Sequence, residues 1–198
     1  CLSIVGLFAE AFATYQTEAA CSSVGHPLAY ADLARLSAQF AGWLQHGAGL
    51  ARGDRVAVQM PNLIQYLVVC LGALRAGMVV VNTNPLYTER ELEHQLNDAN
   101  VKVMVVQANV AQTAAAVLPK TDVETVVVTE IADLHPQPKR TLINFLVKYV
   151  KRMVPAFSIP GSLKLNDVLK AGAKTRYRAV ILNRDDLAML QYTGGTTG

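Results

Sequence analysis

The sequence predicts an α/β fold, a layered α/β/α body with a largely parallel sheet, and two observations carry this prediction. Short apolar runs alternate with segments of helical periodicity, and the links between them are short and rich in turn or cap residues. Such alternation buries a parallel sheet between two layers of helices. The composition agrees, because 198 residues that are 52% hydrophobic and 17% charged can bury one substantial core.

The first 60 residues contain two predicted helices and one strand. An apolar spacing in residues 4–18 indicates an amphipathic helix, and Gly25-His26-Pro27 marks a turn. A second helix carries one apolar face, whose members are Leu33, Leu36, Phe40, Trp43 and Leu44. We therefore expect Trp43 in the core. Gly47 and Gly49 end this helix, and a strand follows at 55–60.

From residue 62 onward strands and helices alternate. Asn62 is the expected cap of a helix over 62–76, and 78–81 has the unbroken apolar character of a buried parallel strand. The capping box Thr88-Glu89-Arg90-Glu91 predicts a helix that continues to about Ala99. A strand at 101–106, a helix at 110–118 and a strand at 124–129 follow. The last predicted strand, Leu187 to Tyr192, is mostly apolar and should be buried.

Residues 131–180 interrupt this rhythm and form a basic, proline-rich insert. No acidic residue lies between Asp133 and Asp167, whereas six basic residues do. Within the insert, Thr141–Val154 has the spacing of a basic amphipathic helix, with Lys148 and Lys151 on one face. Its apolar side either packs on the protein's own core, which we favour, or lies on an anionic membrane surface.

Charge and cysteine usage narrow the class of protein. A net charge of +3 over the whole chain is too small to indicate a nucleic-acid partner. Cys1, Cys21 and Cys70 form no Cys-x-x-Cys pair, which favours a reducing compartment over disulfides or zinc. No basic leader precedes Arg35 and no apolar run has the length of a membrane span. We expect a cytoplasmic protein, or one peripheral on the inner face of the membrane.

The last seven residues are the strongest candidate for a binding site. They are Tyr192, Thr193, Gly194, Gly195, Thr196, Thr197 and Gly198. Glycines allow the backbone N–H groups to close around an anion, and threonine hydroxyls can bond phosphate oxygens. The segment lacks the lysine of a Walker A loop. From composition alone, a plain surface turn explains it equally well.

The literal string Tyr192–Gly198 resembles the opening of the phosphate-loop signature of AMP-forming acyl-CoA synthetases, the adenylate-forming superfamily. The segment 53–62 is similar to the family's Gly-Asp-Arg-Val-Ala strand and the Pro-Asn that follows it. The segment 74–88, continued by 91–98, is similar to the bacterial long-chain fatty-acid–CoA ligases in particular. These three matches occur in the family's order across positions 53 to 198.

This resemblance implies an activity for the complete protein. It would activate a long-chain fatty acid with ATP and Mg²⁺ to an acyl-adenylate, and then transfer the acyl group to CoA. Residues 193–198 would bind the β- and γ-phosphates, with Tyr192 packing the base of the loop. We expect residues 1–198 to be an incomplete N-terminal portion of the AMP-binding domain, without the C-terminal domain. We expect no catalytic or metal-binding residue here, and no activity of the chain alone; a homodimer is compatible with the resemblance.

Other interpretations stay open. The substrate could be an aryl or medium-chain acid, or the chain could come from a peptide-synthetase adenylation domain. A non-catalytic, membrane-associated binding module is a third interpretation. The four histidines are scattered in the sequence and suggest no metal site, and Asp185-Asp186 is expected to form a turn or helix cap. We expect the loop containing Asn82, Asn84, Pro85 and Tyr87 near the active-site face, without an assigned role.

Overall fold

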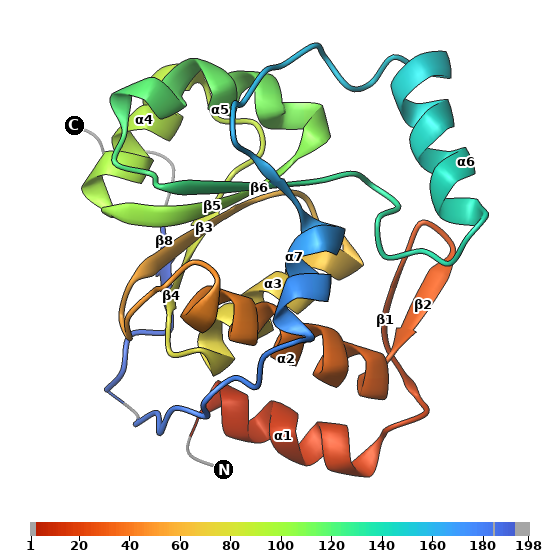
Figure 1. The fold of residues 1–198 in the computed structure, drawn as a ribbon, viewed down its shortest axis with the longest axis vertical. Helices are drawn as coiled ribbons and strands as arrows, with labels where there is room; N and C mark the ends of the chain where they lie inside the picture. The colour runs from red at the N-terminus through yellow and green to blue at the C-terminus, as the bar shows by residue number, and fades with distance from the viewer. Residues whose placement is uncertain (1–2, 184, 193–198) are drawn as a thin grey trace.

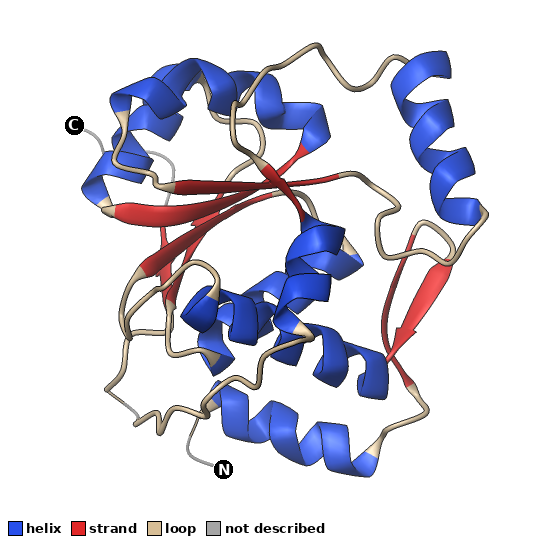
Figure 2. Ribbon diagram, in the orientation of Figure 1, coloured by secondary structure: helices blue, strands red, loops and turns tan. Residues whose placement is uncertain are grey.

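A six-stranded parallel sheet forms the centre of the computed structural model, which describes residues 3–183 and 185–192. The strand order is β7-β6-β5-β3-β4-β8, and every adjacent pair is parallel. Helices cover both faces (Figures 1 and 2). The predicted α/β/α fold is therefore confirmed. The strands are β3 (Arg55–Gln59), β4 (Val79–Thr83), β5 (Val101–Gln107), β6 (Thr125–Thr129), β7 (Leu163–Lys164) and β8 (Met189–Gln191).

The helices divide between the two faces of the sheet. One face carries α2 (Tyr30–His46), α3 (Ile64–Arg75) and α7 (Leu165–Gly172), and α1 (Ile4–Thr14) packs outside them. The other carries α4 (Glu89–Asp98) and α5 (Ala111–Val117). Short 3₁₀ turns, Ala108–Val110 and Leu118–Lys120, flank α5. Helix α6 (Lys139–Phe145) and the π-helical turn that continues it (Leu146–Val150) stand away from the sheet (Figure 1).

Two hydrophobic clusters lie on opposite faces of the sheet. The larger one joins α2, α3 and α7 to the strands and contains Phe40, which is fully buried. Trp43 belongs to it with 5% of its surface exposed, so its expected place in the core is confirmed. Cys70 is equally buried, and this burial raises the pKa of its thiol to about 12. Cys70 is therefore a protonated packing residue at neutral pH.

The start of α4 follows the sequence prediction in detail. The Thr88 side chain accepts a hydrogen bond from the Glu91 backbone N–H at 3.4 Å, and Glu91 Oε2 accepts one from the Thr88 backbone N–H at 2.8 Å. Both partners thus satisfy amides that the first turn of a helix leaves without a carbonyl. The Glu91 carboxylate accepts from the Thr88 backbone N–H and from the Thr88 hydroxyl, and these two bonds hold its pKa below the ordinary value.

Several boundaries differ from the sequence predictions. The turn predicted at 25–27 lies inside a hairpin that the sequence analysis missed, formed by β1 (Ala19–Ser23) and β2 (His26–Ala29). Asn62 does not cap α3, because the Leu63 N–H bonds the Pro61 carbonyl at 2.8 Å and the helix begins only at Ile64. Residues 131–180 contain β7 and α7, which pack on the main body.

The basic helix and the last strand also require corrections. The helix predicted over 141–154 spans Lys139–Val150 instead, since Arg152 has φ +50°, a left-handed conformation that cannot continue it. No residue of 139–150 is buried, so the favoured prediction that this helix packs on the protein's core is wrong. Strand β8, expected to be buried, is a half-exposed edge strand that pairs with β4.

No helix within the described residues is both long and apolar enough to cross a bilayer.

Helices α2 and α7 approach so closely that only glycine fits at one position. A Cβ atom on Gly172 would lie 1.8 Å from the Gln39 carbonyl oxygen. We expect Gly172→Ala to lower the free energy of unfolding by about 1–3 kcal/mol, because backbone must move to remove the overlap. Ala171→Gly is the matched control on the exposed side of α7 and should cost about 1 kcal/mol or less. Urea denaturation compares the two, and a stabilised Gly172→Ala variant would contradict the packing.

The capping box makes stability depend on pH. Because the folded-state pKa of Glu91 is lowered, its stabilising contribution is complete above the ordinary glutamate pKa of about 4.3 and is lost as pH falls through the folded-state value. We expect Glu91→Gln to be less stable than the unmodified protein at pH 7 and to approach it near pH 3. Thermal unfolding at both pH values tests this, with the neighbouring Glu89→Gln as control.

Candidate functional site

A cleft of about 420 Å³ opens at the carboxyl ends of β3, β4 and β8. The connection after β3 leads to α3 on one face of the sheet, whereas the connection after β4 leads to α4 on the other. The chain therefore parts at this edge, which is where parallel α/β sheets bind ligands. The lining residues are Met60, Pro61, Asn62, Tyr66, Asn82, Thr83, Asn84, Pro85, Tyr87, Gln191 and Tyr192.

Two buried glutamines hold the loop after β4 in place. Gln95 on α4 donates to the Asn82 carbonyl at 3.1 Å, and Gln59 at the end of β3 donates to the Asn84 carbonyl at 3.4 Å. Both side chains are buried, with at most 1% of their surface exposed. Because buried amides need hydrogen-bond partners, these two side chains fix the backbone of this wall of the cleft. Sequence reasoning missed them, because a glutamine on a strand or helix carries no local signal of its distant partner.

Tyr192 closes the cleft on the side of β8. Its ring packs beside the cluster under α4, and its hydroxyl donates a hydrogen bond to Asp98 at the end of that helix. Partial burial, and then the bond to Asp98, raise the pKa of Tyr192 to about 12. On the same strand Gln191 accepts a hydrogen bond from the Asn82 amide at 2.8 Å. The neutral Tyr192 is therefore held from two sides, directly before Thr193.

The structure gathers some of the residues singled out from the sequence and leaves others outside. The loop residues Asn82, Asn84, Pro85 and Tyr87 do lie at the cleft, with Asn62 beside them. The expected phosphate-binding residues Thr193, Gly194, Gly195, Thr196, Thr197 and Gly198 lie outside the described part of the chain, which leads into them from the cleft through Tyr192.

Asp186 forms a turn, as expected, and lies before the amino end of β8. It accepts a hydrogen bond from the Asn183 N–H at 2.6 Å and contacts the Arg52 guanidinium with both oxygens at 2.7 Å. These bonds lower the pKa of its carboxyl. Asp186 is therefore a structural residue near the amino end of β8, whereas the cleft lies at the carboxyl ends of the strands.

Two of the histidines that are scattered in the sequence lie close together in the structure. The rings of His26 and His135 lie 4.9 Å apart, between the β1–β2 hairpin and the segment before α6. Burial, and then the neighbouring His135, lower the pKa of His26. The sequence could not show this pair because 108 other residues separate its members. Among the described residues no three His, Cys, Asp or Glu side chains come together as a metal site.

Comparisons with known proteins identify the family. The model of the protein family described as "AMP-binding enzyme" matches residues 8–198. The chain is 46% identical over 196 residues to a long-chain-fatty-acid–CoA ligase of Escherichia coli O157:H7, covering 99% of this chain and 35% of that protein. It is 33% identical over 198 residues to the corresponding ligase of Bacillus subtilis strain 168, covering 99% of this chain and again 35% of the relative. The chain thus spans about a third of the length of these curated relatives.

Solved structures share the fold. A long-chain-fatty-acid-CoA ligase from Archaeoglobus fulgidus has a TM-score of 0.72 at 24% identity, covering 100% of this chain and 35% of that one. An anthranilate CoA ligase in complex with anthranoyl-AMP has a TM-score of 0.76 at 18% identity, covering 98% of this chain and 32% of the other. With its parallel sheet, its cleft at the strand ends and a family match over nearly its whole length, this chain belongs to the AMP-binding enzyme family.

Proposed function

We propose that the complete protein is an ATP-dependent, AMP-forming ligase that joins a long-chain fatty acid to CoA. The observation that carries the proposal is the Gly/Thr-rich segment Thr193–Gly198, which directly follows β8 and Tyr192 at the cleft. Support for the substrate class comes from the 46% identity with the ligase of Escherichia coli O157:H7. We further propose that residues 1–198 are the N-terminal portion of the AMP-binding domain, with 131–180 as an insert.

In the first half-reaction, an oxygen of the fatty carboxylate forms a bond to the α-phosphorus of ATP, and the bond from that phosphorus to the pyrophosphate oxygen breaks. Negative charge grows on the departing pyrophosphate. Backbone N–H groups of 193–198 and the hydroxyls of Thr196 and Thr197 would stabilise this charge, because donors fixed before the reaction need no reorganisation. ATP would enter as its magnesium complex. Among the described residues no three His, Cys, Asp or Glu side chains come together to hold that ion.

In the second half-reaction, the CoA thiol gives up its proton to solvent and its sulfur forms a bond to the acyl carbonyl carbon. The bond from that carbon to the phosphate oxygen breaks, and AMP leaves with its electron pair. The part of the chain described here contributes position and not proton transfer. Gln59 and Gln95 hold one wall of the cleft, and Tyr192 holds the strand that leads into the phosphate-binding segment. Such fixed positioning is itself a large contribution to catalysis.

Other ligases of the superfamily remain the second candidate. An aryl or medium-chain acid, or the amino acid of a peptide-synthetase domain, would leave the phosphate-binding role of 193–198 unchanged. The likeness to an anthranilate CoA ligase supports the shared fold alone at 18% identity. The membrane-associated binding module, without catalysis, is the third candidate.

A membrane contact through the basic helix is part of the proposal. Four apolar side chains of 139–153 are exposed to solvent and are here called the outer face: Leu142, Leu146, Val150 and Met153, with exposures of 58%, 39%, 62% and 52%. The same stretch carries Lys139, Lys148, Lys151 and Arg152 and no acidic residue; Lys148 also lines the groove beneath the helix, and it adds to the positive charge of the surface from that side. Apolar side chains flanked by cations suit the interface of an anionic bilayer. We therefore propose peripheral binding through this segment.

Fatty-acid-dependent exchange of labelled pyrophosphate into ATP tests the activity. We expect the complete protein to catalyse it with palmitate, and Thr196→Ala/Thr197→Ala to slow it at least about a hundredfold, since two hydrogen bonds to charged oxygens are lost and each is worth about 1.5–3 kcal/mol. Thr121→Ala is the control, because its hydroxyl bonds the Leu118 carbonyl away from the cleft.

Three outcomes of that assay would count against the proposal. Exchange that prefers benzoate or a medium-chain acid favours another ligase, and no exchange with any acid favours the binding module. Residues 1–198 alone should catalyse no exchange, so activity of this piece would overturn the expectation that it is inactive by itself.

Sedimentation with vesicles tests the membrane contact. We expect Lys148→Glu/Lys151→Glu to weaken binding of the complete protein to phosphatidylglycerol vesicles by one to two orders of magnitude, because each cation near an anionic surface contributes about 1 kcal/mol and its replacement adds repulsion. Lys170→Glu/Lys174→Glu on and after α7 makes the same charge change elsewhere and should have a smaller effect. Equal binding of both variants would contradict a specific role for this helix.

A further inference from the structure

A groove of about 670 Å³ separates α6 and its π-helical turn from β6, β7 and α7. Polar contacts anchor the helical segment at its middle and just beyond its carboxyl end. Asn144 accepts from the Ala132 N–H at 3.0 Å and donates to Asp133 at 3.2 Å, while Asn109 donates to the Met153 carbonyl at 2.9 Å. No residue of 139–150 is buried. The segment is therefore fixed in position although its side chains, among them Ile143 and Val147, are at most half-buried.

The segment lines this groove with residues other than those of the outer face. Arg140, Thr141, Asn144, Phe145, Lys148 and Tyr149 line the groove, at the spacing of three and four residues that defines one side of a helix. The four residues of the outer face, Leu142, Leu146, Val150 and Met153, are absent from that lining. The residues that line the groove and the four of the outer face are therefore different residues of the segment. One set can contact a bilayer while the other remains available to a ligand.

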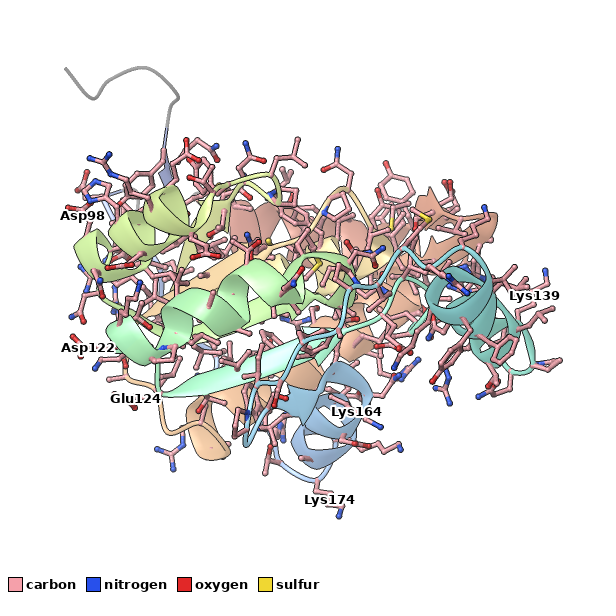
Figure 3. All side chains as sticks on the ribbon, turned by 90° about the horizontal axis from the view of Figure 1, so that it is seen from above. Asp98, Asp122, Glu124, Lys139, Lys164 and Lys174 are labelled. Atoms are coloured by element: carbon pink, nitrogen blue, oxygen red, sulfur yellow. The ribbon has the colours of Figure 1, made fainter. Side chains whose placement is uncertain are left out.

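The groove face combines apolar surface with positive charge. The rings of Phe145 and Tyr149 lie 5.2 Å apart and are 53% and 60% exposed, and the Lys148 ammonium lies 5.5 Å from the Tyr149 ring. Phe157 and Leu163 supply apolar surface across the groove. The opposite wall also carries a cation, Lys164, in β7 beside α7 (Figure 3).

The acidic side chains of the groove do not cancel this charge. Asp133 already accepts from the Glu130 N–H at 2.8 Å, from Thr129 at 3.1 Å and from Asn144 at 3.2 Å. Asp167 pairs with Lys170 at 3.4 Å. Glu130 is the remaining acid of the lining, against three further cations, which are Arg140, Lys148 and Lys164. An anionic head group with an apolar tail matches this arrangement.

We propose that this groove binds a long-chain carboxylate at a site separate from the nucleotide cleft, where the acid is held before it reaches the reaction centre. The cations of both walls hold the carboxylate, and the acyl chain lies along Phe145 and Tyr149. The volume falls within the range of about 300–1,000 Å³ that ligand sites commonly have. The inference rests on the proposed activity towards fatty acids. A bilayer contact through the outer face would keep the groove close to the source of the ligand.

Photolabelling locates the site directly. The complete protein is incubated, without nucleotide or vesicles, with palmitate that carries a diazirine at its methyl end, then irradiated, and the labelled peptides are identified by mass spectrometry. We expect labels within 137–170. Phe145→Ser and Lys148→Glu should each weaken this labelling about tenfold in a palmitate titration. Leu146→Ser and Lys151→Glu, matched changes at residues that do not line the groove, should leave it unchanged.

The outcomes separate this inference from the proposed function. Labels confined to other peptides, or equal labelling of the Phe145→Ser and Leu146→Ser variants, would overturn the groove site. Groove labelling without any exchange would leave the site standing and refute the ligase, whereas exchange without groove labelling would do the reverse. Circular dichroism of each variant confirms folding.

Discussion

The right-handed crossover between parallel strands is the constraint on which this structure depends. It determines, for each step along the sheet, which face the connecting helix must cover. The chain moves from β3 to β4 in one direction and then back past β3 to β5, so α3 and α4 are placed on opposite faces. The cleft at the strand ends follows from this reversal. It does not depend on any single side chain, and the two separate hydrophobic clusters have the same origin.

Polar side chains then fix the positions of helices and loops that the crossovers determine only approximately. Arg75 is the clearest case, because its guanidinium donates to the Ala34 carbonyl at 2.7 Å, to the Ser37 hydroxyl at 2.7 Å and to the Tyr177 hydroxyl at 2.9 Å. It also lies over the rings of Phe12 and Tyr177. One side chain of α3 thereby joins α1, α2 and the segment after α7. The buried glutamines at the cleft act in the same way on the loop after β4.

The features that could be predicted from the sequence are those that depend on residues close together in the chain. The capping box at Thr88 and the apolar face around Trp43 involve neighbouring residues, and both predictions are confirmed. The position of the loop containing Asn82 and Asn84 could be expected from the ends of predicted strands. The contacts that could not be predicted join distant residues: Gln95 with Asn82 across two elements, His26 with His135, and the hairpin partners of β1. The packing of α6 on the core was predicted wrongly, because an amphipathic sequence shows that a helix has an apolar side but not what covers that side.

Strand β8 has a consequence for handling the chain as an isolated polypeptide. Within the described residues it pairs with β4 on one side, and it leaves the N–H and C=O groups of its other side without a strand. With Leu187 53% exposed and Met189 38% exposed, this border is both apolar and ready to accept a strand from another molecule. Self-association through β-augmentation would therefore rise with concentration during refolding, and low concentrations or a lysine at position 189 would suppress precipitation.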